Sequence, residues 1–303
     1  MRVILLTLAM AWLSFADRTI AQSDAHLEIG GGKIDLTFSS APDEALRKLA
    51  LAWVASSARA VTVYYEQFPV SHLEIRLRFF EGHGVRGGRT TGRDGALITV
   101  AIGRSSSASD FAEDWVLTHE MVHLAFPSVP EEHHWIEEGS ATYVEPIARA
   151  RAGGLTPEKV WGDLIDGLPK GLPQAGDRGL DFTRTWGRTY WGGALFCLLA
   201  DIEIRKRTGN KKGLEDALRA ILKAGGTIES DWPIVRSLEI GDRGTGVSVL
   251  RELYEKMKAA PTSADLSALW KELGVERGGG KIEFIDGAPL ASIRKAITQP
   301  VSP

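Results

Sequence analysis

Residues 119–123 read His-Glu-Met-Val-His, and residues 135–143 read Trp-Ile-Glu-Glu-Gly-Ser-Ala-Thr-Tyr. Residues four apart project from the same face of a helix, so His119 and His123 can bind one metal ion. Glu120, one step around the helix, can then reach a water molecule bound to that ion. This spacing is typical of zinc hydrolases, and it predicts that the first stretch is helical.

The residues before the first motif favour a helix that runs through it. Residues 110–118 contain neither Pro nor Gly, and Ser109 or Asp110 can cap a helix at their start. Apolar residues from Phe111 to Phe126 recur at roughly helical spacing. We therefore expect one helix from about residue 110 through the motif. The alternative, that the two histidines are ordinary helix residues, is disfavoured by the glutamates that follow.

The third metal ligand is expected on the second stretch. A catalytic zinc ion usually has three protein ligands, and two histidines with one glutamate are a recurrent set. A third histidine at the metzincin spacing would fall on Val129, which excludes that class. Glu138 is the best candidate, because Glu137 points about a quarter turn away and is expected to be a solvated acid. His133 and His134 are expected to be exposed or to support the ligands.

Other residues of the second stretch can support the site. Thr142 lies one turn beyond Glu138, and Glu145 shares the same helical face. Either side chain can orient a metal-binding histidine. The small residues Gly139 and Ala141 are expected to let this helix approach the metal-binding helix closely.

Composition limits the class of protein. The chain has 303 residues, of which 44% are hydrophobic and 25% are charged, enough for one large or two small domains with a core. The net charge is -3, and the charges are interspersed, so we expect no nucleic-acid partner. Cys197, the single cysteine, excludes an intrachain disulfide and is expected to be a small buried hydrophobic residue.

The start of the chain has the pattern of a targeting segment. A basic residue, Arg2, precedes an apolar run from Val3 to Phe15 that is too short to span a bilayer comfortably. This predicts a signal peptide over residues 1–21, with cleavage after Ala21, and a secreted or periplasmic protein. An uncleaved membrane anchor is the alternative. No other segment is apolar for long enough to cross a membrane, so no stable insertion is expected after cleavage.

Residues 22–303 are expected to form a single α+β domain with a small mixed sheet and a mainly helical C-terminal body. The sheet-containing lobe spans about 22–108, with strands at 27–38, 73–80 and 96–102 and a helix at 44–65. Residues 82–95 are dense in Gly and Arg and are expected to be a mobile hairpin tip or, alternatively, a loop that reaches the substrate. The helical lobe spans about 109–303. Its later elements are expected near residues 133–151, 156–165, 190–208, 213–223, 247–258, 264–273, 281–285 (a strand) and 290–297.

Three ordered blocks of sequence resemble a known family. The two stretches quoted above, continued by Val144 and Glu145, resemble the gluzincin metallopeptidases, in which a glutamate before Gly-x-Ala completes the zinc site. A third block, Thr-Tyr-Trp-Gly-Gly-Ala-Leu at residues 189–195, is similar to the tyrosine-bearing helix of the glycyl aminopeptidase branch. The resemblance covers roughly residues 110–275. It implies a thermolysin-like catalytic domain that binds one Zn²⁺ ion and hydrolyses a peptide or protein substrate.

The resemblance also implies residue roles. His119, His123 and Glu138 would bind zinc. Glu120 would act as general base and then as general acid, and Tyr190 would donate a hydrogen bond to the developing oxyanion.

The sequence departs from the family at two points. Gly192 stands where the family usually has lysine, and the strand before the metal helix has no acidic anchor for a substrate amine. A catalytically silent relative that binds peptides or a cell-envelope partner is therefore the alternative to a peptidase. A zinc hydrolase of non-peptide bonds is a third hypothesis.

Overall fold

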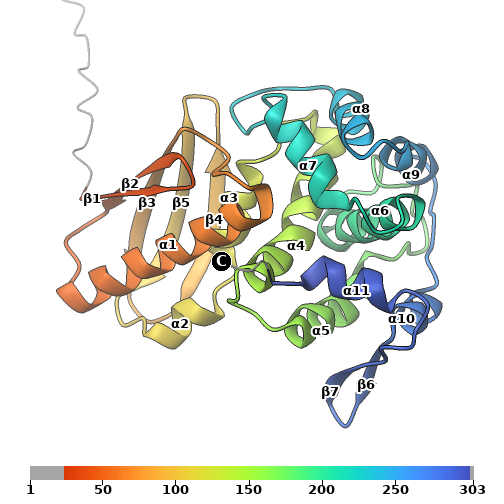
Figure 1. Ribbon diagram of the computed structural model, residues 1–303. Helices are drawn as coiled ribbons and strands as arrows, with labels where there is room; N and C mark the ends of the chain where they lie inside the picture. Colours follow the sequence, from red (N-terminus) through yellow and green to blue (C-terminus); the bar gives the residue numbers. More distant parts are fainter. Residues whose placement is uncertain (1–23, 301–303) are drawn as a thin grey trace, which may run out of the picture.

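A five-stranded mixed sheet forms the first part of the fold (Figure 1). The computed structural model describes residues 24–300, so the predicted signal peptide at residues 1–21 lies outside the described residues. The strands are β1 (Ala25–Ile29), β2 (Gly32–Phe38), β3 (His72–Phe80), β4 (Val85–Thr91) and β5 (Ala96–Gly103). Their spatial order is β1-β2-β3-β5-β4, which places β4 at one edge. Strand β3 is parallel to both its neighbours, whereas the outer pairs are antiparallel.

Helix α1 (Glu44–Tyr65) lies across this sheet (Figure 1). Asp43 caps its start, because the Asp43 carboxylate accepts a hydrogen bond from the Leu46 N–H at 2.8 Å. Alternate residues of β2, β3 and β5 are buried, as expected for strands with one face on a hydrophobic layer. The predicted helix at residues 44–65 is confirmed.

Two parts of the sheet differ from the sequence prediction. The strand expected at residues 27–38 is a hairpin of β1 and β2, which turns at Gly30 and Gly31 with φ values of 59° and 86°. The expected loop over residues 82–95 is wrong in its centre, because β4 pairs there with β5. Strand β4 lacks an alternation of buried residues, since it is an edge strand whose residues are all at least partly exposed.

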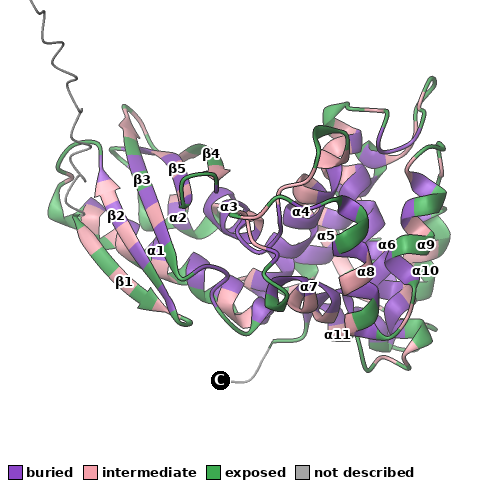
Figure 2. Cartoon of the chain, turned by 90° about the horizontal axis from the view of Figure 1, so that it is seen from above, coloured by how far each residue is buried: buried purple, intermediate pink, exposed green. Residues whose placement is uncertain are grey.

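The rest of the described chain forms a mainly helical body beside the sheet (Figure 2). Its longer elements are α2 (Ala108–Glu113), α3 (Val116–His123), α4 (His134–Arg151), α5 (Pro157–Gly167), α6 (Gly193–Arg207), α7 (Leu214–Lys223), α8 (Ile234–Thr245), α9 (Val249–Met257), α10 (Leu266–Leu273), β6 (Val275–Gly278), β7 (Lys281–Phe284) and α11 (Ala291–Thr298). Short helical turns are η1 (Glu131–His133), η2 (Leu168–Gly171) and η3 (Gly187–Gly192). The predicted α+β class, with a sheet followed by helices, is confirmed.

The sequence pattern does not predict α8 or β6. Gly241 and Gly244 lower the helix propensity of α8. Both glycines lie against α7, and a Cβ atom on Gly241 would stand 3.3 Å from the Ala217 Cβ. Close packing on α7 thus stabilises a segment whose local propensity is weak.

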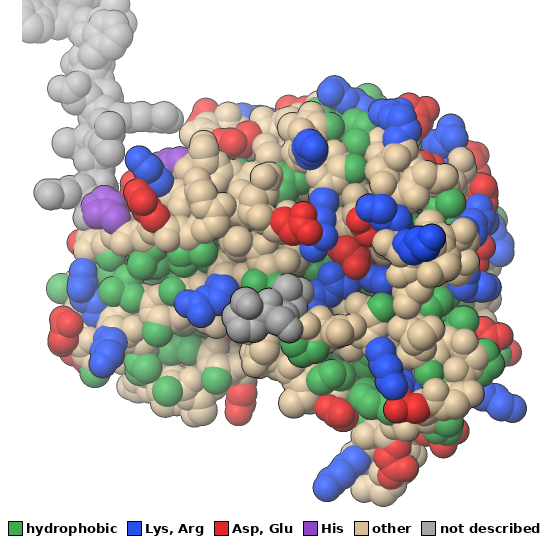
Figure 3. Space-filling model, viewed as in Figure 1, with side chains coloured by type: hydrophobic (Ala, Val, Ile, Leu, Met, Phe, Trp, Pro, Cys, Tyr) green, Lys and Arg blue, Asp and Glu red, His purple; other side chains and the backbone are tan. Residues whose placement is uncertain are grey.

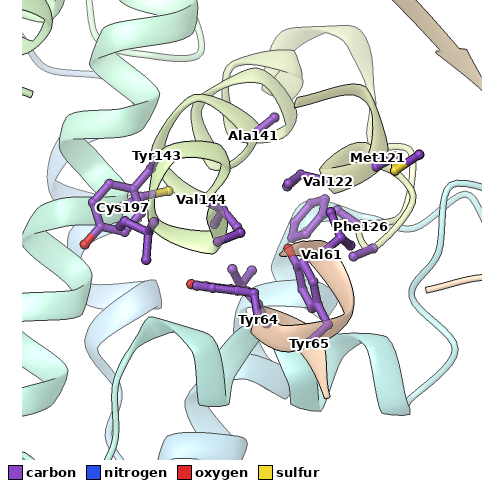
Figure 4. Packing of buried hydrophobic residues seen from close by; sticks show 14 of the residues in the cluster. Val61, Tyr64, Tyr65, Met121, Val122, Phe126, Ala141, Tyr143, Val144 and Cys197 are labelled. Atoms are coloured by element: carbon purple, nitrogen blue, oxygen red, sulfur yellow. The ribbon is translucent and has the colours of Figure 1, made fainter. Parts of the chain in front are cut away.

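A continuous hydrophobic core links the sheet to the helical body (Figures 2 and 4). Figure 4 shows side chains of α1, α3, α4 and α6 that meet in this core; they include Val61, Tyr64, Tyr65, Met121, Val122, Ala141, Tyr143, Val144 and Cys197. Cys197 is buried, as predicted, and burial raises the pKa of its thiol. Helix α3 is therefore held between α1 and α4.

Buried ion pairs also join α4, α6 and α7. The Arg205 guanidinium lies 2.7 Å from both Asp201 Oδ1 and Glu215 Oε1. Arg151 lies 3.0 Å from Glu215, and the Tyr143 hydroxyl donates to Asp201 Oδ2 at 2.9 Å. Removing one partner would leave a buried charge uncompensated, which typically costs roughly 3–5 kcal/mol. This network fixes α6 relative to α4.

The surface is of mixed charge. On the face in Figure 3, basic and acidic side chains are interspersed. Among residues 24–300, no helix has both the length and the hydrophobicity that a membrane span requires.

Candidate metal centre

The helix of the first motif, α3, is shorter than predicted. The expected continuous helix from residue 110 is wrong, because α2 ends at Glu113 and Asp114 is extended. The Asp114 carboxylate accepts hydrogen bonds from the N–H groups of Val116 (3.0 Å) and Leu117 (3.1 Å), and so caps a new helix. The Trp53 indole of α1 also donates to Asp114, at 3.0 Å. A contact with α1 thus fixes where α3 begins.

Helix α2 has its own cap. Ser107, rather than Ser109 or Asp110, occupies the N-cap position, and it forms a capping box with Asp110. Asp110 therefore belongs to the first turn of α2 and not to the helix of the motif.

The structure brings His119, His123 and Glu138 together. The Nε2 atom of His119 lies 3.1 Å from Glu138 Oε2, and that of His123 lies 3.6 Å from the same oxygen. One potential ligand atom from each of the three residues lies within 4.8 Å of the others. Two imidazole nitrogens and one carboxylate oxygen are a recurrent donor set of catalytic zinc, so these residues can hold a zinc ion.

Charge and burial act together in this cluster. Burial alone would raise the pKa of Glu138, but hydrogen bonds from His119, His123 and His134 hold this pKa well below its usual range. Burial lowers the pKa of His119, against the influence of Glu138. Burial also opposes protonation of His123, but Glu138 outweighs it and raises the pKa of His123. Glu138 is thus ionised and His119 favours its neutral form, whereas His123 favours its protonated form, so metal binding would displace a proton from His123.

Glu120 lies beside β4. The Thr90 hydroxyl donates to Glu120 Oε2 at 2.6 Å and lies 2.9 Å from the Glu120 backbone oxygen. Gly88 has no side chain at this point, and a Cβ atom there would lie 2.7 Å from Glu120 Oε1. Sequence reasoning missed both residues, because it treated residues 82–95 as a loop. The signals for a strand there were its three β-branched residues, Val85, Thr90 and Thr91.

His134 contacts the third ligand candidate from the other side. Its Nε2 atom lies 3.3 Å from Glu138 Oε1, and its Nδ1 atom lies 2.7 Å from Glu137 Oε2. Glu137 also accepts a hydrogen bond from the Val129 N–H at 3.2 Å. The expectation that Glu137 is a solvated acid is therefore wrong, because its side chain is 15% exposed and hydrogen-bonded. His133 points elsewhere, with its Nδ1 atom 3.0 Å from Asp181.

Tyr190 lies in η3, a π-helical turn that leads into α6. Its ring is stacked near that of His119, with the centroids 6.3 Å apart. Burial and the neighbouring Glu138 raise the pKa of the Tyr190 phenol to about 12. The phenol is therefore protonated near neutral pH and can donate a hydrogen bond. Turns of this type are frequent at functional sites.

A backbone contact holds η3 and α6 against α4. Gly139 follows Glu138, and it packs on Gly193 so closely that neither residue has room for a Cβ atom. The sequence prediction gave Gly139 the wrong partner, since it faces α6 rather than the metal-binding helix. Glu138 and Tyr190 thus come from two helical segments in direct backbone contact.

Thr142 and Glu145 make no hydrogen bond to His119 or His123 among the residues that the structure describes. The Thr142 hydroxyl is buried and has no hydrogen-bond partner there. Glu145 pairs with Arg149 at 3.0 Å, and burial raises the pKa of Glu145 to about 7.

One cavity of about 560 Å³ contains these groups. It is lined by Trp115, Ser128, Tyr190 and Ile228 and by residues of β4, α3 and α4, which are Gly87, Gly88, Arg89, Thr90, Val116, His119, Glu120, His123, His134, Glu137 and Glu138. The candidate ligands, Glu120 and Tyr190 therefore share one space that is open to solvent and bordered by the edge of the sheet.

Solved structures share this fold at low sequence identity, although no family model and no curated protein matches the sequence. An aminopeptidase N family protein from Idiomarina loihiensis is 16% identical, with a TM-score of 0.62 over 83% of this chain and 49% of that one. The M1 zinc metallopeptidase of Deinococcus radiodurans is 17% identical, with a TM-score of 0.51 over 81% and 53%. A mutant of an M1 zinc metallopeptidase from the same organism, bound to a Tyr-Ser-Ala substrate, gives 0.52 at 16% identity over 80% and 53%.

These similarities define a class of fold. The sheet and helical body of this chain have the gluzincin-like fold of M1 zinc metallopeptidases. The chain spans about half the length of the structures it matches.

Proposed function

We propose that this protein is a zinc-dependent metallopeptidase that hydrolyses peptide bonds, with one Zn²⁺ held by His119, His123 and Glu138. The observation that carries this proposal is that three potential ligand atoms lie within 4.8 Å of one another in the cavity that also holds Glu120 and Tyr190. The resemblance to the glycyl aminopeptidase branch and the M1 fold both support it.

In the proposed reaction, the zinc ion, Glu120 and Tyr190 would each have a separate role. Bound zinc would polarise the scissile carbonyl and lower the pKa of a water molecule towards about 7. Glu120, oriented by the Thr90 hydroxyl, would accept the proton of that water and pass it to the leaving amine. Tyr190, protonated at neutral pH, would donate a hydrogen bond to the developing oxyanion.

The edge of the sheet offers a way to hold a peptide. Among the strands of residues 24–300, β4 pairs with β5 alone, and residues 87–90 of β4 line the cavity. An extended peptide can add to such an edge through backbone hydrogen bonds, whatever its sequence. We propose that β4 aligns the substrate beside the metal site.

The catalytically silent binding protein is the second candidate. It is motivated by Gly192, which replaces the usual lysine, and by the missing acidic anchor for a substrate amine. In the structure this glycine has a packing role: a Cβ atom there would lie 3.1 Å from both Arg188 Nη1 and Leu180 Cδ2. A larger residue at this position would require these neighbouring side chains to shift by a few tenths of an ångström.

The proposal also covers the cellular location of the protein and the position of the peptide bond that it cleaves. The pattern of residues 1–21 favours a secreted or periplasmic protein, with an uncleaved anchor as the alternative. The fold and the proposed site fit aminopeptidase-type and internal cleavage equally.

The decisive experiment measures zinc content and peptide cleavage in the same preparations. Wild type should contain one zinc ion per chain and cleave peptides in a proteome-derived library, with loss of activity on chelation. Glu120→Gln should keep the zinc and lose turnover, while Glu276→Gln, on the exposed face of β6, serves as a matched control. Zinc-loaded wild type that cleaves no peptide would favour the silent binding protein, and cleavage of esters alone would favour a non-peptide hydrolase.

A further inference from the structure

Two exposed tryptophans stand at the ends of a row of rings that crosses the candidate metal site. The Trp115 ring lies 5.4 Å from that of His119, nearly perpendicular to it. His119 is stacked near Tyr190, and the Trp186 ring is stacked on Tyr190 with its centroid 5.8 Å away. The row therefore contains one proposed zinc ligand and the proposed oxyanion donor, with a tryptophan at each end.

These indoles are unusually accessible. Trp115 is 53% and Trp186 61% exposed, although a tryptophan normally gains free energy by burying its large ring. Among residues 24–300, the large hydrophobic residues with comparable exposure are Trp115, Phe182, Trp186, Val235 and Ile285. Two of the three exposed aromatic rings thus contact residues of one candidate active site.

The two tryptophans reach the site from different elements. Trp115 immediately precedes α3 and lines the same cavity as Val116 and residues 87–90 of β4. Trp186 immediately precedes η3, on the other side of Tyr190 in the row. Trp115 thus adjoins the site on the His119 side and Trp186 on the Tyr190 side, so a peptide that crosses the site has an indole near each end of the row.

We propose that Trp115 and Trp186 set the substrate preference of the proposed peptidase by stacking on aromatic or bulky apolar side chains on the two sides of the scissile bond. This inference rests on the proposed function. Stacked aromatic pairs contribute beyond the area they bury, and each exposed indole presents a rigid apolar surface at little conformational cost. The preferred substrates are peptides with Phe, Tyr, Trp or Leu next to the cleaved bond.

The test uses the zinc-loaded full chain and a peptide set that varies the residues on each side of one bond. Trp115→Ala and Trp186→Ala should each lower kcat/KM by roughly tenfold for peptides with a bulky apolar residue on one side, with little change for Gly, Ala or Ser there. Trp→Phe at the same position should restore most of the preference. Phe182→Ala is the matched control, because Phe182 is 55% exposed but contacts neither His119 nor Tyr190.

Binding measurements separate this inference from the proposed function. Kd values of the same peptides for Glu120→Gln, alone and combined with each Trp→Ala change, show the preference even if wild type lacks turnover. Absence of cleavage by zinc-loaded wild type would end the proposed function. Three results, each at unchanged zinc content, would overturn the role of the tryptophans. The Trp→Ala variants could lose affinity equally for all peptides, they could lose none, or Phe182→Ala could lose as much as they do.

Discussion

Replacing His134 by alanine should weaken zinc binding without removing a proposed ligand. The His134 ring lies between two carboxylates, 3.3 Å from Glu138 Oε1 and 2.7 Å from Glu137 Oε2. Glu138 Oε2 faces His119 and His123 instead. His134 thus holds the carboxylate oxygen that points away from the proposed metal position, and its loss would free the carboxylate to rotate.

The structure sets the size of this effect. Loss of a residue that orients a metal ligand typically costs about 10–100-fold in metal affinity, or roughly 1.4–2.7 kcal/mol. The His134 side chain is 44% exposed, so water competes for its contacts. We therefore expect the lower end of the range, about tenfold.

Zinc Kd values from competition with a chromophoric chelator measure this loss, and the absorption spectrum of the Co²⁺-substituted protein reports the ligand geometry. His134→Gln should recover part of the affinity, because an amide can still donate to Glu138. His133→Ala is the matched control, because the His133 ring is next in sequence to that of His134 but pairs with Asp181. Equal zinc affinity in wild type and His134→Ala, or an equal loss in His133→Ala, would refute the positioning role.

Three further outcomes follow from the site. Gly88→Ala should lower kcat by at least about tenfold and leave zinc content unchanged, because the new methyl group would contact Glu120. Gly287 has open space around its Cα, so Gly287→Ala should behave like wild type in the same assay. Tyr190→Phe should lower kcat roughly a hundredfold or more with a smaller change in KM, and steady-state kinetics with unchanged turnover would remove it from the reaction. Because burial raises the pKa of Glu145 from 4.5 to about 7, the unfolded chain releases this proton first as the pH rises. Relative to Glu145→Gln, wild type should therefore lose roughly 3 kcal/mol of unfolding free energy as the pH rises from about 4.5 to 7, and no more above pH 7. Denaturant titrations measure this difference, and a difference that does not change with pH would contradict the prediction.

The sequence predicts the parts of the site that depend on local spacing. The pair His119 and His123, and the helix from Glu44 capped by Asp43, follow from offsets of three and four residues. The break before α3 does not, because it depends on a hydrogen bond from Trp53, which is distant in sequence. No window of sequence around Asp114 contains that partner.

Edge position explains what was missed around β4. A central strand is recognised by its alternating buried residues. Within the part of the chain that the structure describes, β4 has a partner on one side only, and none of its residues is buried. The contacts of Gly88 and Thr90 with Glu120 arise from tertiary packing of the sheet edge on α3. The role of His134 likewise depends on the side-chain conformations of Glu137 and Glu138, whose carboxylates both contact the His134 ring.

The contact between Gly139 and Gly193 sets the distance between two groups of the proposed site, the zinc ligand Glu138 and the oxyanion donor Tyr190. Gly139 follows the carboxylate of Glu138, and Gly193 lies three residues after the phenol of Tyr190. A single methyl group at either glycine would push these two side chains apart while leaving every signature residue in place. In this chain, an intact His-Glu-x-x-His motif and Tyr190 would therefore not suffice for activity, because both act only while this contact between two glycines is kept.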